Sequence, residues 1–106
     1  MTSTISHLEA ALAQKRIKID EVDTAILDAL SKRGDLALEV LEIKMKLNAP
    51  IYNQVREEAV ISRAVGAYKG PLPAESVRKI FEVIMEEHRN LQIARQSEAA
   101  SLDDAA

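Results

Sequence analysis

The feature that most constrains this chain is a long N-terminal stretch without proline, from about Ser6 to Leu47. Apolar residues recur along it in steps of three and four, the period of one helix face. They are Ile19, Val22, Ile26, Leu30, Ala37, Val40 and Leu47. Gly34 costs about 1 kcal/mol relative to alanine but does not end a helix, whereas Asn48-Ala49-Pro50 does. The stretch therefore predicts one very long helix.

A helix of this length needs a partner. About 42 residues make a helix of roughly 63 Å, whereas a compact domain of this size is very roughly 35 Å across. The apolar residues left uncovered need another surface; they are Ile5, Leu8, Leu12, Ile17, Ile19 and Val22. We expect a two-fold dimer that shares the long helices. The alternative is a first helix broken near Lys15 or Gly34, giving a four-helix monomer.

Two shorter helices follow, at about Asn53–Tyr68 and Pro73–Arg95. Asn53 suits an N-cap and Pro73 a first helical turn. Their apolar faces are Ala59, Val60, Ile61, Ala64 and Val65, then Val77, Ile80, Phe81, Ile84 and Leu91. We predict an all-α helical domain over residues 1–95 and a disordered, acidic and alanine-rich tail over residues 96–106.

Composition excludes several function classes. Without cysteine there is no disulfide or thiolate site, and two histidines are too few for a typical zinc site, so we expect no metal. Fourteen bases against seventeen acids, a net charge of −3, argue against a nucleic-acid partner. No apolar run approaches a membrane span, and the N-terminus does not resemble a secretory signal. We expect a cytoplasmic protein.

Charged and polar residues interrupt the apolar faces. Arg33 and Lys44 are eleven residues apart, so on a helix they differ by only about 20° in direction, and both point inward. The others are Arg56, Glu57, His88 and Gln92. Unpaired charges on a core face are costly, so the two cations need acidic partners or a bound anion. One interpretation is a structural ion-pair network closing on Glu57. The other is a pocket for a small polyanion, because cations outnumber acids there.

Arg16 lies about 25 Å along the helix axis from Arg33 and roughly a quarter-turn away. It cannot share a pocket with Arg33 of the same straight helix, but it can reach the pocket of an antiparallel partner. The alternative is a solvated arginine. No glycine-rich phosphate loop, HExxH or GxSxG motif is present. Arginine, lysine and glutamine donors suit electrostatic and conformational catalysis better than a proton relay.

In their order and spacing, these residues resemble the all-helical, AroQ-type chorismate mutase family, from about Arg16 to Gln92. The matching pieces are residues 16–23, 26–27, Arg33, Lys44, Pro50-Ile51, residues 56–58, 70–72, 80–81 and 84–85, and Asn90-Leu91-Gln92. The resemblance implies an intertwined three-helix dimer. It also implies the Claisen rearrangement of chorismate to prephenate, toward phenylalanine and tyrosine, without cofactor, metal or covalent intermediate.

The resemblance also implies the roles of the site residues. Arg16 of the partner and Arg33 would hold the two carboxylates of the substrate, since an arginine fork binds a carboxylate through two bonds. Lys44 and Gln92 would donate to the ether oxygen. Glu57 would accept from the ring hydroxyl, and Arg56 would line the same wall.

Two positions depart from the family pattern. Asn53 stands where an aspartate near the hydroxyl pocket is common, and its amide oxygen can still accept a hydrogen bond. His88 stands where a serine often contacts a carboxylate, and a histidine donates there best when protonated. Both substitutions bear on affinity more than on activity.

Two other functions are compatible with the same features. Isochorismate-pyruvate lyase resembles the mutases closely, although Glu57 and Gln92 favour the mutase because they fit its hydroxyl and ether contacts. A non-catalytic helical dimerisation or regulatory module would use the inward polar residues as structural ion pairs only.

Overall fold

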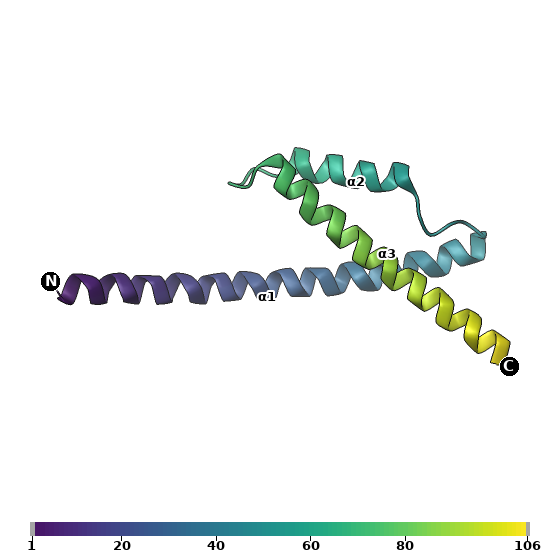
Figure 1. Cartoon of the computed structure of the whole chain (residues 1–106), viewed down its shortest axis with the longest axis horizontal. Coiled ribbons are helices and arrows are strands. Elements are labelled where there is room, and N and C mark those ends of the chain that lie inside the picture. The colour runs from purple at the N-terminus through teal and green to yellow at the C-terminus, as the bar shows by residue number, and fades with distance from the viewer. Residues whose placement is uncertain (1, 106) are drawn as a thin grey trace. The chain divides into compact units, whose positions relative to one another are not determined.

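The computed structural model describes residues 2–105, and side chains are described for residues 3–102. Three helices make up the fold (Figure 1): α1 (Thr2–Leu47), α2 (Gln54–Ala67) and α3 (Ala74–Ala105). They contain 46, 14 and 32 residues, and residues 2–105 contain no strand. The predicted all-α class, with one very long helix and two shorter ones, is confirmed. The chain divides into two compact units, Met1–Arg33 and Gly34–Ala106.

The first unit is helical from Thr2 onward and belongs to α1. Eight of its large apolar side chains are 50–66% exposed; they are Ile5, Leu8, Leu12, Ile17, Ile19, Val22, Ile26 and Leu27. Helix α1 is unbroken at Lys15 and Gly34, so the alternative of a broken first helix is wrong. One glycine costs less than the hydrogen bonds that a break would remove.

Helix α1 ends where the sequence predicts, at Asn48-Ala49-Pro50. Asn48 has φ 56°, a left-handed conformation that asparagine tolerates better than most residues. Its N–H donates to the carbonyl of Met45 at 3.2 Å, and the N–H of Ala49 donates to the carbonyl of Lys44 at 2.8 Å. This is the Schellman arrangement, and Pro50 cannot continue the helix. The last turn of α1, which carries Lys44, therefore has a fixed end.

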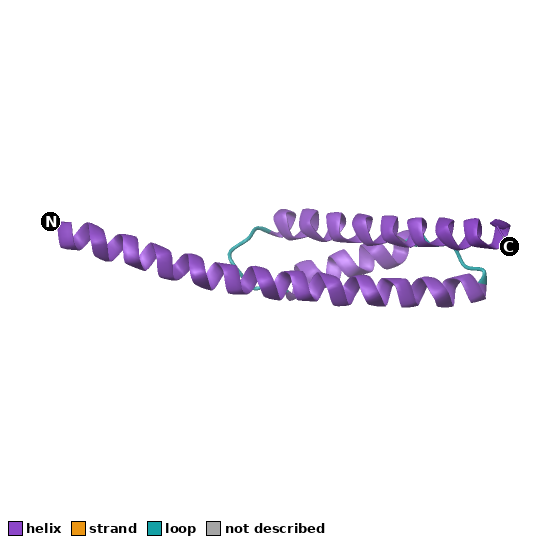
Figure 2. Ribbon diagram, turned by 90° about the horizontal axis from the view of Figure 1, so that it is seen from below, coloured by secondary structure: helices purple, strands orange, loops and turns teal. Residues whose placement is uncertain are grey.

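In the second unit, α2 lies beside the N-terminal half of α3 (Figures 1 and 2). Val60 and Ile61 of α2 pack with Met85 of α3, and partly buried Val65 and Phe81 complete the cluster. Val77 and Leu41 are also buried. Leu41 lies on the same α1 face as Ala37 and Lys44, because steps of four and three residues keep one direction.

The predicted apolar faces are partly wrong in phase. Leu41 and Met85 are buried although the predicted faces include neither. Val40, Leu47, Ile80 and Leu91, which the predicted faces do include, are 37–71% exposed in the single chain. The period alone gives a broad apolar stripe, and the packing partner decides which edge of that stripe is covered.

The connection between α2 and α3 is held by Tyr68, the C-cap of α2. Its hydroxyl accepts a hydrogen bond from the N–H of Leu72 at 3.2 Å. The same ring lies so close to Gly70 that a side chain there would collide with it. The carbonyl of Pro73 then accepts from the N–H groups of Ser76 and Val77, at 3.0 and 3.2 Å, and α3 begins.

The C-terminal segment differs from the expected disordered tail, because α3 continues through residues 96–105. The segment contains neither glycine nor proline and is rich in alanine with glutamate, glutamine and leucine, which are strong helix formers. Lack of an apolar period made the segment resemble a disordered one, but a helix can extend on propensity once its preceding turns are fixed. The boundary of the domain at residue 95 stays a prediction.

Candidate active site

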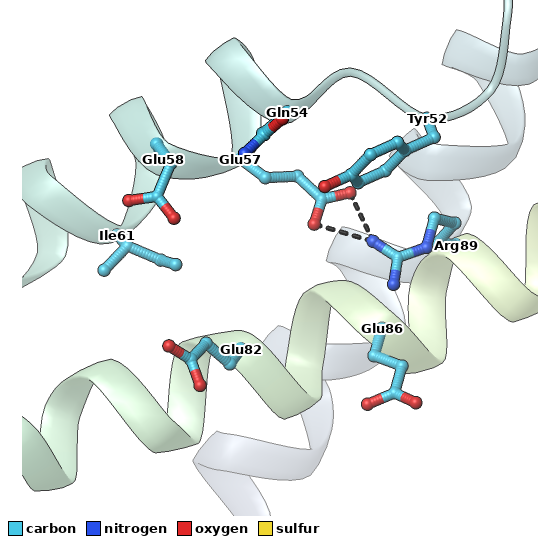
Figure 3. Close-up of a pocket in the computed structure, with 8 residues that line it drawn as sticks. All are labelled: Tyr52, Gln54, Glu57, Glu58, Ile61, Glu82, Glu86 and Arg89. Carbon is cyan, nitrogen blue, oxygen red and sulfur yellow. Dashed lines mark hydrogen bonds and ion pairs between the residues drawn. The ribbon is translucent and has the colours of Figure 1, made fainter.

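Glu57, in the first turn of α2, is held by Arg89 of α3 (Figure 3). The Nη1 atom of Arg89 donates to both carboxylate oxygens of Glu57, at 2.7 and 2.6 Å. Both side chains are about one-quarter exposed. The hydrogen bond that Arg89 donates to Glu57 raises the pKa of Arg89, so the guanidinium stays charged. Glu57 thus has an ion-pair partner, as one interpretation of the sequence expected. The partner is Arg89, which the sequence analysis did not single out.

This pair opens onto a groove of about 250 Å³ between α2 and α3 (Figure 3). The groove is lined by Tyr52, Gln54, Glu57, Glu58, Ile61, Glu82, Glu86 and Arg89. Four carboxylates against one guanidinium make the lining of this groove acidic. This groove is thus not the cationic pocket expected from the sequence, and neither Lys44 nor Gln92 lines it.

Lys44, on the last turns of α1, is half-buried. Its Nζ donates to the backbone carbonyl of Ile51 at 2.7 Å, across the α1–α2 connection. The suggested structural pairing of Lys44 with Glu57 is wrong, because a carbonyl of the connecting loop lies within reach instead. An ammonium group has three donors, so this bond fixes the direction of Nζ and leaves capacity for a ligand.

Gln92 of α3 is a buried polar residue, with 8% of its surface exposed. Its Nε2 donates to the carbonyl of Ala37 on α1 at 2.7 Å. Since a carbonyl can only accept, this bond sets the amide with its nitrogen toward α1, and the second N–H of that nitrogen is oriented with it. Ala37 and Lys44 are two helical turns apart, so both donors lie toward one face of α1.

His88 lies one turn before Gln92 on α3 and is half-buried. Its Nε2 is 3.6 Å from the position that a Cβ on Gly34 would occupy. A Cβ at Gly34 would thus make ordinary van der Waals contact with the imidazole and with Leu91.

Asn53 is the N-cap of α2, as predicted. Its side-chain Oδ1 accepts a hydrogen bond from the backbone N–H of Arg56 at 3.0 Å. The cap fixes the first turn of α2, which carries both Arg56 and Glu57. The side chain of Arg56 is exposed, so Asn53 and Arg56 reach any ligand from the outer rim rather than from the core.

Arg16 and Arg33 belong to the first unit of the chain. Arg16 is exposed and Arg33 half-buried. The structure therefore brings Lys44, Glu57, His88 and Gln92 into one unit with Asn53 and Arg56. Arg16 and Arg33, which the resemblance assigns to the substrate carboxylates, lie outside that unit.

Arg89 is the residue that sequence reasoning missed. It stands next to His88 and one turn before Gln92, both already assigned inward. The available signal was an arginine beside two inward polar residues, with an inward glutamate, Glu57, on the preceding helix. It was overlooked because Arg89 lies off the apolar face of α3.

Within residues 2–105, no group of histidine and acidic side chains is arranged to hold a metal ion. In the same range, no helix combines the length and the apolar character that crossing a membrane requires.

Comparisons with known proteins agree with the fold. The family model for chorismate mutase type II matches residues 15–93. A chorismate mutase of Methanocaldococcus jannaschii is 38% identical over 82 residues, covering 76% of this chain and 83% of that protein. A bifunctional chorismate mutase/prephenate dehydratase of Neisseria gonorrhoeae is 38% identical over 87 residues, which are 82% of this chain but 23% of that protein.

Among solved structures, the chorismate mutase (form II) of Thermus thermophilus superposes with a TM-score of 0.75 and 32% sequence identity. The match covers 76% of this chain and 92% of that one. The region matched by the family model includes Arg16, Arg33, Lys44, Glu57 and Gln92. This chain belongs to the chorismate mutase type II family.

Proposed function

We propose that this chain is a chorismate mutase that converts chorismate to prephenate. The observation that carries the proposal is that Lys44 and Gln92, two donors toward one face of α1, are each oriented by a backbone carbonyl, Ile51 for Lys44 and Ala37 for Gln92. Hydrogen-bond donors that are oriented before the substrate binds stabilise the charge that develops in the transition state.

The reaction is an intramolecular rearrangement, so one C–O bond breaks, one C–C bond forms, and no proton or external group is exchanged. Charge grows on the ether oxygen as its C–O bond breaks. In the proposal, Nζ of Lys44 and the amide of Gln92 donate to that oxygen. Holding the substrate with its two reacting carbons close supplies the orientational part of the rate.

The ring hydroxyl of the substrate is a donor and needs an acceptor. Glu57 supplies one in the proposal, because a carboxylate has about four lone-pair positions and Arg89 occupies one on each oxygen. Arg56 and Asn53 lie at the N-terminus of the same helix and line the adjacent rim. In the proposal, His88 donates to a substrate carboxylate, which a histidine does best when protonated.

The two substrate carboxylates are assigned to Arg33 and to Arg16 of a second copy of the chain. The support for a second copy is the row of apolar side chains on residues 5–27, which are at least half exposed in the single chain. In the proposed homodimer, which covers these side chains, each site contains Arg33 of one chain and Arg16 of the other. The cytoplasmic location expected from the sequence belongs to the same proposal.

Incubation of the purified protein with chorismate tests the proposal. We expect loss of chorismate absorbance with prephenate as the product. Formation of salicylate and pyruvate from isochorismate, with chorismate untouched, would instead identify a lyase.

Binding gives a second test that does not depend on turnover. A bicyclic dicarboxylate that mimics the transition state should bind the folded protein and raise its melting temperature. At a free concentration one hundred times its Kd, it should stabilise the folded state by about 2.7 kcal/mol. A non-catalytic dimerisation module predicts an unchanged melting temperature.

A further inference from the structure

Arg89 is bound to Glu57, but the proposed chemistry gives Arg89 no role. It reaches from α3 to α2 and contacts both oxygens of Glu57 through a single nitrogen, at 2.7 and 2.6 Å (Figure 3). A charge-assisted contact this short, between side chains that are three-quarters buried, restricts the rotation of the glutamate. The carboxylate direction is therefore set by α3 as well as by α2.

Tyr52 in turn fixes the guanidinium. Its ring centroid lies 4.9 Å from Cζ of Arg89, within the range of a cation–π contact. Tyr52 directly precedes the N-cap Asn53, so the ring is anchored to the same turn that carries Glu57. Arg89 is thus held on both sides, by the carboxylate and by the aromatic face.

A second ion pair also connects α2 and α3, so this connection alone does not distinguish the pair of Arg89 and Glu57. Arg78 of α3 also faces a glutamate of α2, Glu58, but at 3.6 Å. Those side chains are 36% and 59% exposed, and an exposed pair contributes little. The pair of Arg89 and Glu57 is shorter, more buried, and ends on the glutamate assigned to the substrate.

We propose that Arg89 is a positioning residue: with Tyr52 behind it, it holds the Glu57 carboxylate in the direction that accepts the ring hydroxyl of the substrate. This inference rests on the proposed function, in which Glu57 makes that contact. Arg89 acts through Glu57 and does not touch the substrate.

The test is a double-mutant cycle on the full chain with Arg89→Met and Glu57→Ala, measured as kcat/KM for chorismate. Because a hydrogen bond to a charged group is at stake, Arg89→Met should lower kcat/KM by about tenfold. In the Glu57→Ala background the same substitution should have no further effect, since no carboxylate remains to be positioned. Arg89→Lys, which keeps one charged donor, should restore part of the loss. Arg78→Met is the matched control and should leave kcat/KM unchanged.

Two results would overturn the inference. One is an Arg89→Met enzyme with normal kcat/KM and a lowered denaturation midpoint, which makes Arg89 a structural bridge. The other is a loss that persists in full in the Glu57→Ala background. If Arg89→Met does not fold, Arg89→Lys is taken through the same cycle and must show the same dependence on Glu57. Normal activity of Glu57→Ala alone would refute both the inference and the role of Glu57, whereas a wild-type chain inert toward chorismate would refute the proposed function itself.

Discussion

At the scale of single residues, three consecutive positions of the α1–α2 connection hold the candidate site. The carbonyl of Ile51 accepts from Lys44, the ring of Tyr52 lies against Arg89, and the side chain of Asn53 caps α2. Arg89 in turn binds Glu57. Each of these groups therefore has a defined direction before a substrate arrives, which lowers the cost of ordering it.

Replacing Lys44 by alanine tests the donor at the ether oxygen. By analogy with removal of one oxyanion-hole donor, we expect kcat to fall by about 10²- to 10³-fold. The lost bond to Ile51 should cost about 1 kcal/mol of stability. Lys46→Ala, at an exposed lysine on the same helix end, is the control and should leave kcat unchanged. Steady-state kinetics with chorismate and urea denaturation give the two values, and an active Lys44→Ala enzyme would refute the assignment.

Two substitutions at Asn53 test its role as the N-cap of α2. Asn53→Ala removes the acceptor for the N–H of Arg56 and should lower the free energy of unfolding by about 1 kcal/mol. Asn53→Asp keeps the acceptor and adds a charge that favours the positive end of the helix dipole, so its stability should match or exceed that of the wild type. Urea denaturation measures both. Equal destabilisation by the two variants would show that the cap is not what Asn53 contributes.

Residue by residue, the sequence predicts part of this site. The inward direction of Lys44 and Gln92 follows from helical period alone, and both are at least half-buried. The bonds that orient them could not be predicted, because they end on backbone carbonyls whose positions depend on the loop and on the packing of α3 against α1. Arg89 was missed for a related reason: its importance comes from a partner on another helix, not from its own place in a pattern.

At the scale of elements, end signals predicted more than the apolar period did. Asn48-Ala49-Pro50, Asn53 and Pro73 each mark a helix end that the structure contains. The phase of the apolar faces was predicted less well, since Leu41 and Met85 are buried outside the predicted stripes. Caps are local hydrogen-bond arrangements, whereas the covered edge of a stripe depends on a distant partner.

Gly34 tests the continuity of α1. A Cβ there would meet Nε2 of His88 at 3.6 Å and Cδ2 of Leu91 at 3.7 Å, which are ordinary contact distances. Gly34→Ala should therefore gain the helix propensity of alanine and raise the free energy of unfolding by roughly 0.5–1 kcal/mol. Thermal and urea unfolding measure the change. A clear loss of stability would mean that the close approach of His88 needs the glycine.

The C-terminal part of α3 tests the domain boundary. Beyond Gln92 the side chains described are largely exposed, and the ion pair of Arg95 with Glu98 is local to the helix. A chain that ends after Arg95 should keep its kcat/KM for chorismate and lose less than about 1 kcal/mol of stability, since surface helix ends contribute little. Circular dichroism and the chorismate assay check this; an unfolded or inactive truncated chain would place the boundary further on.

At the scale of the whole molecule, the sequence predicts that the apolar face of the long N-terminal helix must be covered, and a single chain does not cover it. The large apolar side chains on residues 5–27 are at least half exposed, while the cluster shared by α2 and α3 is small. A second copy that covers this surface and contributes Arg16 would serve stability and catalysis together. The proposed activity depends on such a site, assembled from two chains.

Mixing two inactive variants is the decisive test of the shared site. Arg16→Ala and Lys44→Ala chains are unfolded together, refolded at equal amounts, and assayed for conversion of chorismate to prephenate. In a random two-fold assembly half of the dimers are mixed and each has one intact site, so about a quarter of the wild-type activity should return. Activity no higher than that of the separate variants, in a mixture shown to contain mixed dimers, would contradict a site shared between two chains.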